Sequence, residues 1–278
     1  MRLSVATITS NIEVRTGIHL IEMLAPQLAQ AVQPGQYCMV RCCDTDANDP
    51  LLRRPFFVRS VQRGQGLCSL LVSVRGRGTS WLAKQQEGAA LDILGPLGHG
   101  WTVRPTVRNL LLVGEEEYIL SVLLLAQVAI EQEIAITLVA QSSSAEGVYP
   151  PALLPSEVEY SIITRDGSLG QRGELIDVLP SYLDWADALC CGVSHETSVM
   201  LYSHFERMRS KHFAQGIVLR PFVCGSGACL ACSIETHSGL KLVCKDGPVF
   251  HLGEIVERSI EMRSESSAPN DTRSTRRR

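Results

Sequence analysis

Near the end of the chain stands the sequence Cys224-Gly225-Ser226-Gly227-Ala228-Cys229-Leu230-Ala231-Cys232, which Cys244 follows after eleven further residues. The spacing Cys-x4-Cys-x2-Cys…Cys is typical of a plant-type [2Fe–2S] cluster, in which each iron takes two thiolates. Gly225 and Gly227 allow the backbone to turn tightly around an inorganic core, and the alanines leave room for it. The pattern therefore predicts one iron–sulfur cluster with four ligands: Cys224, Cys229, Cys232 and Cys244.

A structural zinc site is the alternative, because zinc also accepts four thiolates. The usual zinc pattern contains two Cys-x2-Cys pairs, whereas this chain contains one, Cys229-Leu230-Ala231-Cys232. The sequence therefore favours the cluster, and with it a protein that transfers single electrons.

The composition fits a redox protein of a reducing compartment. The chain has 278 residues, of which 45% are hydrophobic, enough for a sizeable core divided among two or more domains. Its formal net charge of −3 implies neither nucleic acid nor an anionic membrane as a partner. The six cysteines outside the motif stand mostly among apolar residues, where free cysteine behaves as a small hydrophobe. A thiolate-bound cluster also fits reducing conditions.

No targeting or membrane segment is expected. Arg2 is followed by alternating serine, threonine and isoleucine rather than by the apolar block of a signal peptide. The longest apolar stretch, residues 118–130, contains Ser121 and Gln127 and is too short to span a bilayer. The sequence predicts a soluble, cytoplasmic protein.

The first hundred residues predict an antiparallel β-barrel. Short apolar runs are separated by turn residues such as Pro34-Gly35 and Glu87-Gly88, and one short helix, residues 79–86, interrupts them. The predicted barrel strands are residues 36–41, 55–61, 67–74 and 91–94.

From Asn109 onward, apolar strands alternate with helical segments, which predicts a doubly wound parallel sheet. The predicted strands are residues 110–113, 134–140, 158–164 and 188–191, and the predicted helices are residues 118–132, 173–179 and 195–211. The fold class is therefore α+β and multidomain. The predicted parts are a barrel (1–104), a nucleotide-type α/β domain (105–215), a cluster module (216–262) and a disordered tail (263–278).

Shorter motifs accompany the cysteines along the chain. They are Pro34-Gly35-Gln36-Tyr37, Arg53-Arg54-Pro55-Phe56, Gly76-Arg77-Gly78-Thr79, Leu94-Gly95-Pro96-Leu97-Gly98, Asp166-Gly167-Ser168-Leu169-Gly170 and Cys244-Lys245-Asp246-Gly247-Pro248-Val249-Phe250. In this order and spacing, over about residues 1–255, the chain resembles the ferredoxin–NADP reductase superfamily. Within that superfamily it is similar to the electron-transfer subunits of dihydroorotate dehydrogenase B.

The resemblance implies that the barrel binds FAD. Arg54 suits a bidentate, charge-assisted contact to the FAD pyrophosphate, and Gly76 and Gly78 allow backbone N–H groups to approach it closely. Phe56 replaces an aromatic residue that lines the flavin in relatives. At the next position relatives usually carry Ser or Thr, whereas this chain has Phe57. The implied FAD-binding residues are Arg54, Pro55, Phe56, Phe57, Gly76, Gly78 and Thr79.

The nicotinamide site departs further from the family. Relatives follow the first α/β strand with a run like Gly-Gly-Gly-x-Gly-x-Ala-Pro-Leu, whose glycines bring the backbone close to the cofactor. This chain has Gly114 and then three carboxylates, Glu115, Glu116 and Glu117. The late Cys-Gly-Pro of relatives appears here as Cys191-Gly192-Val193. Acidic residues also suit a first helical turn, but by their charge and bulk we expect them to make NAD(H) binding weak or undetectable.

The resemblance implies an electron-transfer subunit that carries FAD and a [2Fe–2S] cluster and serves pyrimidine biosynthesis. The implied partner is an FMN-type dihydroorotate dehydrogenase catalytic subunit, or another redox subunit, in a hetero-oligomer. Two alternatives stay open. One is a paralogue that has lost NAD(H) binding and acts as an electron-relay or interaction subunit, and the other is a structural cluster protein without flavin.

Overall fold

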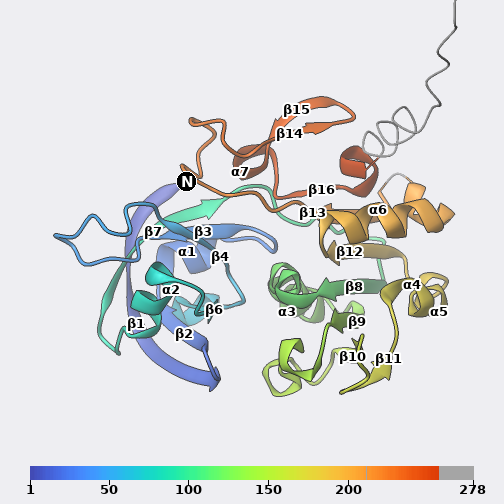
Figure 1. Cartoon of the computed structure of the whole chain (residues 1–278), viewed down its shortest axis with the longest axis horizontal. Helices are drawn as coiled ribbons and strands as arrows, with labels where there is room; N and C mark the ends of the chain where they lie inside the picture. The colour runs from blue at the N-terminus through green and yellow to red at the C-terminus, as the bar shows by residue number, and fades with distance from the viewer. Residues whose placement is uncertain (211, 257–278) are drawn as a thin grey trace, which may run out of the picture.

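The computed structural model describes residues 1–210 and 212–256, which form two seven-stranded sheets and a small two-stranded hairpin. The two large sheets lie side by side in Figure 1, and the hairpin with its neighbouring loops sits above them. The predicted disordered tail, residues 263–278, lies outside the described residues. Among the described residues, no helix is long and apolar enough to cross a membrane.

The first sheet is antiparallel, with the strand order β4-β3-β7-β1-β2-β6-β5. In β7, Leu91, Ile93 and Leu97 are buried and alternate with more exposed residues, as expected for a strand with one face on a core. The predicted antiparallel barrel is confirmed as a curled sheet. Its elements are β1 (Arg2–Arg15), β2 (Ile18–Leu24), α1 (Pro26–Ala31), β3 (Tyr37–Val40), β4 (Arg54–Phe57), β5 (Ser60–Gln62), η1 (Arg63–Gln65), β6 (Leu67–Ser73), α2 (Arg77–Ala83) and β7 (Ala90–Leu97).

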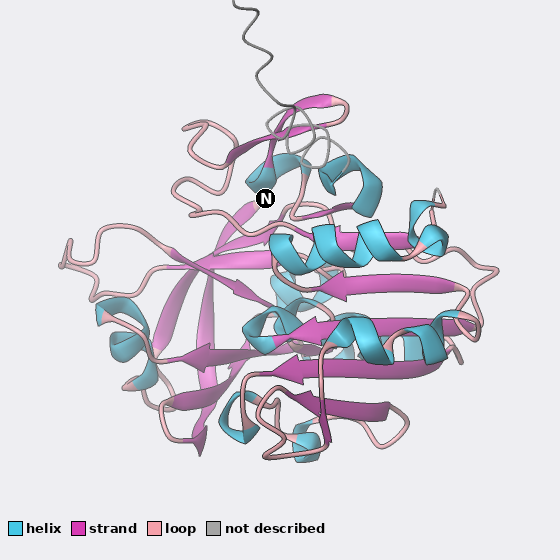
Figure 2. Ribbon diagram, turned by 45° about the vertical axis from the view of Figure 1, so that its right-hand side comes forward, coloured by secondary structure: helices cyan, strands magenta, loops and turns pink. Residues whose placement is uncertain are grey.

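The second sheet has the order β11-β10-β9-β8-β12-β13-β16, and all its strands are parallel except β16. Consecutive residues of β8 point to opposite faces: Leu110 and Leu112 join the core under α3, and Leu111 joins the core under α6. Helices therefore cover both faces (Figure 2), and the predicted doubly wound domain is confirmed. Its first half contains β8 (Asn109–Glu115), η2 (Glu116–Ser121), α3 (Leu123–Glu131), β9 (Ala135–Ser142), η3 (Ala145–Gly147), η4 (Pro151–Leu153), β10 (Glu159–Thr164) and β11 (Gln171–Arg172). Its second half contains α4 (Leu175–Val178), α5 (Pro180–Leu183), β12 (Ala188–Gly192), α6 (His195–His204), η5 (Glu206–Arg209) and β13 (Ala214–Ile217).

The cysteine-rich segment leaves the second sheet after β13 and returns to it as β16 (Val249–His251). Between these strands lie the hairpin of β14 (Ser233–Thr236) and β15 (Gly239–Leu242) and the short helix α7 (Val243–Asp246). The predicted boundary between residues 215 and 216 therefore falls inside β13.

Some predicted helices are shorter than the sequence suggested. The segment predicted as one helix over residues 118–132 begins as a 3₁₀ helix, η2, and continues as α3, since 3₁₀ turns are common at the start of α-helices. The helix predicted over 195–211 ends at His204.

Candidate functional site

The loop that carries the first three cysteines packs against the barrel. A Cβ added at Gly225 would lie 3.1 Å from Leu97 Cδ1 and 3.2 Å from Met39 Cγ. Gly225 and Gly227 have φ values of 69° and 84°, a left-handed conformation that favours glycine. These two glycines therefore let the loop turn sharply while it touches β3 and β7.

The four cysteines form two neighbouring pairs. Cys229 lies next to Cys224, and Cys232 lies next to Cys244. The Cys244 N–H also donates to Cys232 Sγ at 3.4 Å. Among the described residues, no three His, Cys, Asp or Glu side chains already form a complete metal-binding group. Two pairs of thiolates are nevertheless the donor set of a [2Fe–2S] cluster, two for each iron.

Backbone N–H groups point at the sulfurs. The Ser226 N–H donates to Cys224 Sγ at 3.4 Å. Burial raises the pKa of Cys224, but donors from Ser226 and Cys229 outweigh it and lower that pKa to about 5. Burial, followed by the adjacent Cys232, raises the pKa of Cys244 to about 12. At Cys224, N–H groups that stabilise the thiolate fit the predicted cluster, because metal ligands must be deprotonated.

Tyr37 joins the barrel to this loop. Its hydroxyl donates to the carbonyl of Cys244 at 3.1 Å, and its ring stacks on Phe222 with a centroid distance of 4.6 Å. Burial, then the nearby Cys244 and the other sulfurs, raises the pKa of Tyr37, so its phenol stays protonated. The residue stands opposite Phe57 on the adjacent strand β4.

An aromatic cavity of about 310 Å³ lies on the other side of Tyr37. It opens between the barrel, η2 and the segment that enters the cysteine loop. The lining is mostly aromatic and aliphatic with a few polar side chains, which suits a flat heteroaromatic ring that carries polar groups at its edge. The lining residues are Tyr37, Pro55, Phe56, Phe57, Leu71, Ser73, Arg75, Thr79, Glu117, Leu120, Leu219, Arg220 and Phe222.

The residues predicted to hold the FAD pyrophosphate lie beside this cavity. Gly76 and Gly78 fall between two lining residues, Arg75 and Thr79, and a Cβ at Gly78 would lie 3.2 Å from Arg54 Nε. Gly76 is extended, and a Cβ there would meet no atom within 4 Å. No contact within the chain thus requires glycine at 76, and the open space suits a bound phosphate.

The local hydrogen bonds at this turn differ from the expectation. Thr79 Oγ1 accepts the N–H groups of Arg75 at 2.9 Å and of Gly76 at 3.1 Å, so these donors are already engaged. Arg54 Nη1 donates to the carbonyl of Leu52 at 2.6 Å. Because the N–H groups of Arg75 and Gly76 are engaged, the group next to Gly78 that a phosphate would contact is the Arg54 guanidinium, whose positive charge is available although Nη1 bonds to Leu52.

Sequence reasoning missed several residues of the cavity. Tyr37 stood in a motif but received no role, and Phe222 and Arg220 lie just before the cysteine motif. The aromatic residue two positions before Cys224 was the available signal. Leu120 and Glu117 come from the second domain, so their place in the cavity depends on tertiary packing.

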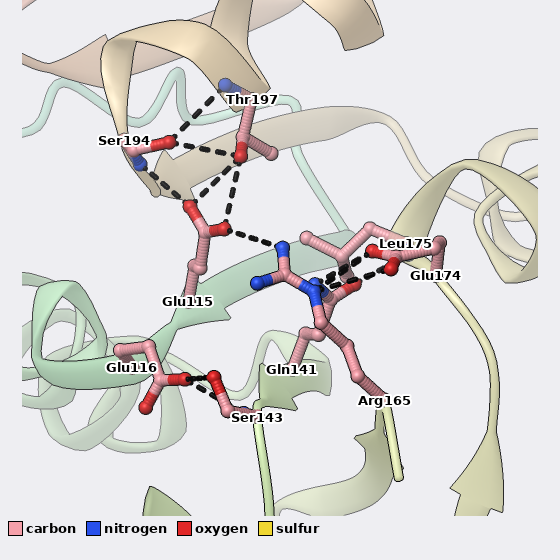
Figure 3. A network of polar contacts seen from close by, with 9 residues as sticks. All are labelled: Glu115, Glu116, Gln141, Ser143, Arg165, Glu174, Leu175, Ser194 and Thr197. Carbon is pink, nitrogen blue, oxygen red and sulfur yellow. Dashed lines mark hydrogen bonds and ion pairs between the residues drawn. The ribbon is translucent and has the colours of Figure 1, made fainter.

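The three carboxylates after Gly114 point in three directions (Figure 3 shows two of them). Glu115 is buried against the start of α6, where it accepts hydrogen bonds from Thr197. Glu116 accepts hydrogen bonds from Ser143, and Glu117 forms an ion pair with Arg75. Each carboxylate thus has partners within the chain, which the sequence did not predict.

Sequence comparisons place this chain among known proteins. Residues 220–256 match the family described as the iron–sulfur cluster binding domain of dihydroorotate dehydrogenase B, which confirms the predicted cluster module. The electron-transfer subunit of dihydroorotate dehydrogenase B (NAD(+)) from Geobacillus thermodenitrificans (strain NG80-2) is 33% identical over 82% of this chain and 89% of its own length. The subunit of the same name from Desulforamulus reducens is 32% identical over 86% of this chain and 92% of its own length.

Solved structures share the fold. An NADH-dependent reduced ferredoxin–NADP oxidoreductase covers 95% of this chain and 94% of its own, with a TM-score of 0.77 and 21% identity. The ferredoxin reductase of carbazole 1,9a-dioxygenase covers 73% of this chain and 67% of its own, with a TM-score of 0.60 and 16% identity. At these identities the similarity establishes the architecture.

Proposed function

Because this chain belongs to the family of electron-transfer subunits of dihydroorotate dehydrogenase B, we propose that it moves electrons between a partner dehydrogenase and cofactors of its own, in pyrimidine biosynthesis. The proposed partner is an FMN-type dihydroorotate dehydrogenase subunit or another redox subunit. The proposed cofactors are a [2Fe–2S] cluster and FAD. The family supports both cofactors. When bound, the cluster transfers one electron at a time, and FAD can exchange one or two electrons.

The observation that carries the proposal is the position of Tyr37. Its ring forms a wall of the aromatic cavity, and its hydroxyl holds the backbone of Cys244. A single side chain therefore separates the proposed flavin site from a proposed cluster ligand. This proximity suits two cofactors that exchange electrons within one subunit.

The four cysteines are the proposed cluster ligands. Cys224 and Cys229 would hold one iron, and Cys232 and Cys244 the other, as their pairing suggests. Cys229 is exposed, whereas Cys232 and Cys244 are buried. The exposed side of the loop is therefore the proposed route by which a partner subunit exchanges electrons with the protein.

The cavity beside Tyr37 is the proposed flavin site. Pro55, Phe56 and Phe57 would contact the ring system, and Thr79 would lie at the end that leads to Gly76 and Gly78. Arg54 would contact the pyrophosphate through its guanidinium. The proposed division is a barrel (1–104), an α/β domain (105–215) and a cluster module (216–262), which contributes β16 to the second sheet.

Purified protein tests the proposal directly. We expect about two iron and two sulfide per chain, one FAD, and an absorption spectrum with flavin and cluster bands. Added dihydroorotate should bleach these bands only in the presence of an FMN-type catalytic subunit that co-purifies with the chain. A preparation with zinc and no sulfide, or one that never retains flavin, would contradict the proposal.

A second candidate function is electron relay without nicotinamide. The observation that favours it is the acidic turn at Glu115 to Glu117, in place of the glycine-rich run of relatives. In that case the subunit would pass electrons between its cofactors and protein partners alone. NADH added anaerobically to the purified protein separates the two candidates, because a subunit that also exchanges electrons with NAD(H) would show rapid bleaching of the flavin and a relay without nicotinamide would not.

A further inference from the structure

In a sheet of this kind a nucleotide is expected to bind at the carboxyl edge, between β8 and β12. The chain runs from β8 through β9 to β10 in one direction and through β12 to β13 in the other, so the strand order reverses there. Open α/β sheets bind their ligands in the crevice at such a reversal. A phosphate in that crevice is held by backbone N–H groups at a helix start.

Glu115, the last residue of β8, already occupies this crevice (Figure 3). Its side chain is only 8% exposed. One carboxylate oxygen accepts the backbone N–H of Ser194 at 2.9 Å and the hydroxyl of Thr197 at 2.8 Å. Ser194 caps the ten-residue helix α6, and Thr197 lies in its first turn. The donors that a phosphate would use are therefore taken by a carboxylate of the chain itself.

The cation at this edge is also engaged. Arg165, which follows β10, donates to Glu115 Oε1 at 3.3 Å and to Glu174 Oε1 at 3.1 Å. Gln141, near the end of β9, donates to the Glu174 carboxylate at 2.9 Å and accepts the N–H of Leu175, the first residue of α4, at 2.6 Å. Side chains at the carboxyl ends of β8, β9 and β10 are thus joined to one another, through Glu174, by ion pairs and hydrogen bonds within the protein.

The backbone closes the remaining space. A Cβ added at Gly192, the last residue of β12, would lie 2.5 Å from the carbonyl oxygen of Tyr118. A Cβ added at Gly114 would lie 2.7 Å from Ile119 Cγ1. The two glycines that border the crevice are covered by η2, the turn that follows β8, so they offer no open surface to a ligand.

We propose that Glu115 is an internal substitute for a dinucleotide phosphate, and that the second domain therefore binds neither NAD(H) nor NADP(H). The crevice is closed by occupation, not by repulsion from exposed charges. Glu116 and Glu117 are not part of the substitute, because Glu116 bonds to Ser143 at 2.6 Å and Glu117 pairs with Arg75 outside the crevice. The fold is kept while its ligand is replaced by a side chain.

Calorimetric titration of ADP and of NADH into the purified holoprotein tests this proposal. Wild type should show no saturable binding at millimolar ligand. Glu115→Ala should bind ADP at least tenfold more tightly than wild type, because it frees Ser194, Thr197 and Arg165. Glu116→Ala is the matched control on the same turn, because Glu116 bonds to Ser143 and does not line the aromatic cavity, and it should behave as wild type. Glu115→Gln keeps the shape of the side chain and should also bind nothing.

Three results would overturn the proposal: saturable binding of micromolar NADH by wild type, equal gains in Glu115→Ala and Glu116→Ala, or a folded Glu115→Ala that gains nothing. If Glu115→Ala does not fold, the titrations of wild type and Glu115→Gln test the proposal. Tight binding by Glu115→Gln would show that the charge of Glu115 alone keeps the nucleotide out, which would overturn the proposal that its side chain occupies the crevice. Iron and flavin contents are measured separately. A protein without cofactors would therefore contradict the proposed function and leave this titration valid.

Discussion

The hydroxyl of Tyr37 and the carbonyl of Cys244 form a hydrogen bond of 3.1 Å between residues 207 positions apart in the chain. Tyr37 begins β3 of the barrel, and Cys244 lies in α7 next to the return strand β16. The bond fixes the cysteine loop against the wall of the aromatic cavity. The geometry between the two proposed cofactor sites therefore depends on one buried phenol.

Replacing Tyr37 with Phe should loosen the cysteine loop while keeping the cavity wall. The loss of one buried hydrogen bond is expected to cost about 1 kcal/mol, which corresponds to a fall in melting temperature of about 2–4 °C. Iron should pass to a chelator faster than in wild type. Stopped-flow chelation and thermal unfolding measure the two effects.

Tyr160→Phe is the control for that variant. Its hydroxyl donates to the Tyr149 carbonyl at 3.2 Å, far from the cysteines in the second domain. It should lower the melting temperature by a similar amount without changing the rate of iron release. Equal iron release from the two variants would disprove a specific role for Tyr37.

Cys232→Ser should strip or strongly destabilise the cluster, because a serine oxygen is a poor ligand for a soft, sulfur-rich core. Iron, acid-labile sulfide and the visible cluster bands measure the loss. Cys43→Ser, outside the motif, is the control and should retain normal iron and sulfide. Full iron content in Cys232→Ser would remove this residue from the ligand set.

Arg54→Ala should weaken FAD binding by about 10- to 100-fold, as expected when a charge-assisted hydrogen bond of about 1.5–3 kcal/mol is lost. The cluster should remain, because its ligands lie in a different part of the chain. Arg77→Ala removes an equal charge from the Gly76–Gly78 turn that lies beside Arg54, where Arg77 pairs with Asp49 at the surface. Fluorescence of released flavin compares the variants. Equal losses would indicate that the contact with Arg54 is not specific.

Gly76→Ala should separate binding from stability. The added Cβ meets no atom within 4 Å and the backbone is extended, so the free energy of unfolding without flavin should change by less than about 0.5 kcal/mol. FAD affinity should nevertheless fall, because the methyl group fills the space proposed for the phosphate. Gly64→Ala, also in open space but in η1, should leave FAD affinity unchanged. An unaltered affinity for FAD in Gly76→Ala would show that the phosphate does not bind beside Gly76.

Much of the fold was predictable from local patterns. The alternation of apolar strands and helices after Asn109 predicted the second domain, and the four cysteines predicted the cluster module that the family match confirms. The first two strands were not located individually, because most side chains of β1 are exposed or half-buried and its hydrophobic period is weak. The resemblance to dihydroorotate dehydrogenase B electron-transfer subunits is confirmed by the relatives.

The contacts of the acidic turn could not be predicted from the sequence. The sequence suggested that all three glutamates place charge and bulk in the turn where a dinucleotide would lie. The end of β8 and the positive φ of Glu116 instead send them to different neighbours. Those neighbours lie far away in the chain: Ser143 for Glu116, Thr197 for Glu115 and Arg75 for Glu117. Only the tertiary fold brings such residues together.

The return of the chain as β16 makes the cysteine-rich segment an insertion with both ends tied to one sheet. β16 is antiparallel to β13 and covers a strand edge that would otherwise offer unpaired backbone groups to other molecules. A protein truncated before Val249 would therefore lose its redox centre and also expose the unpaired edge of β13, through which it would tend to aggregate. Excision of residues 219–247 with a short linker between the two strands is the safer way to build a variant without the cluster.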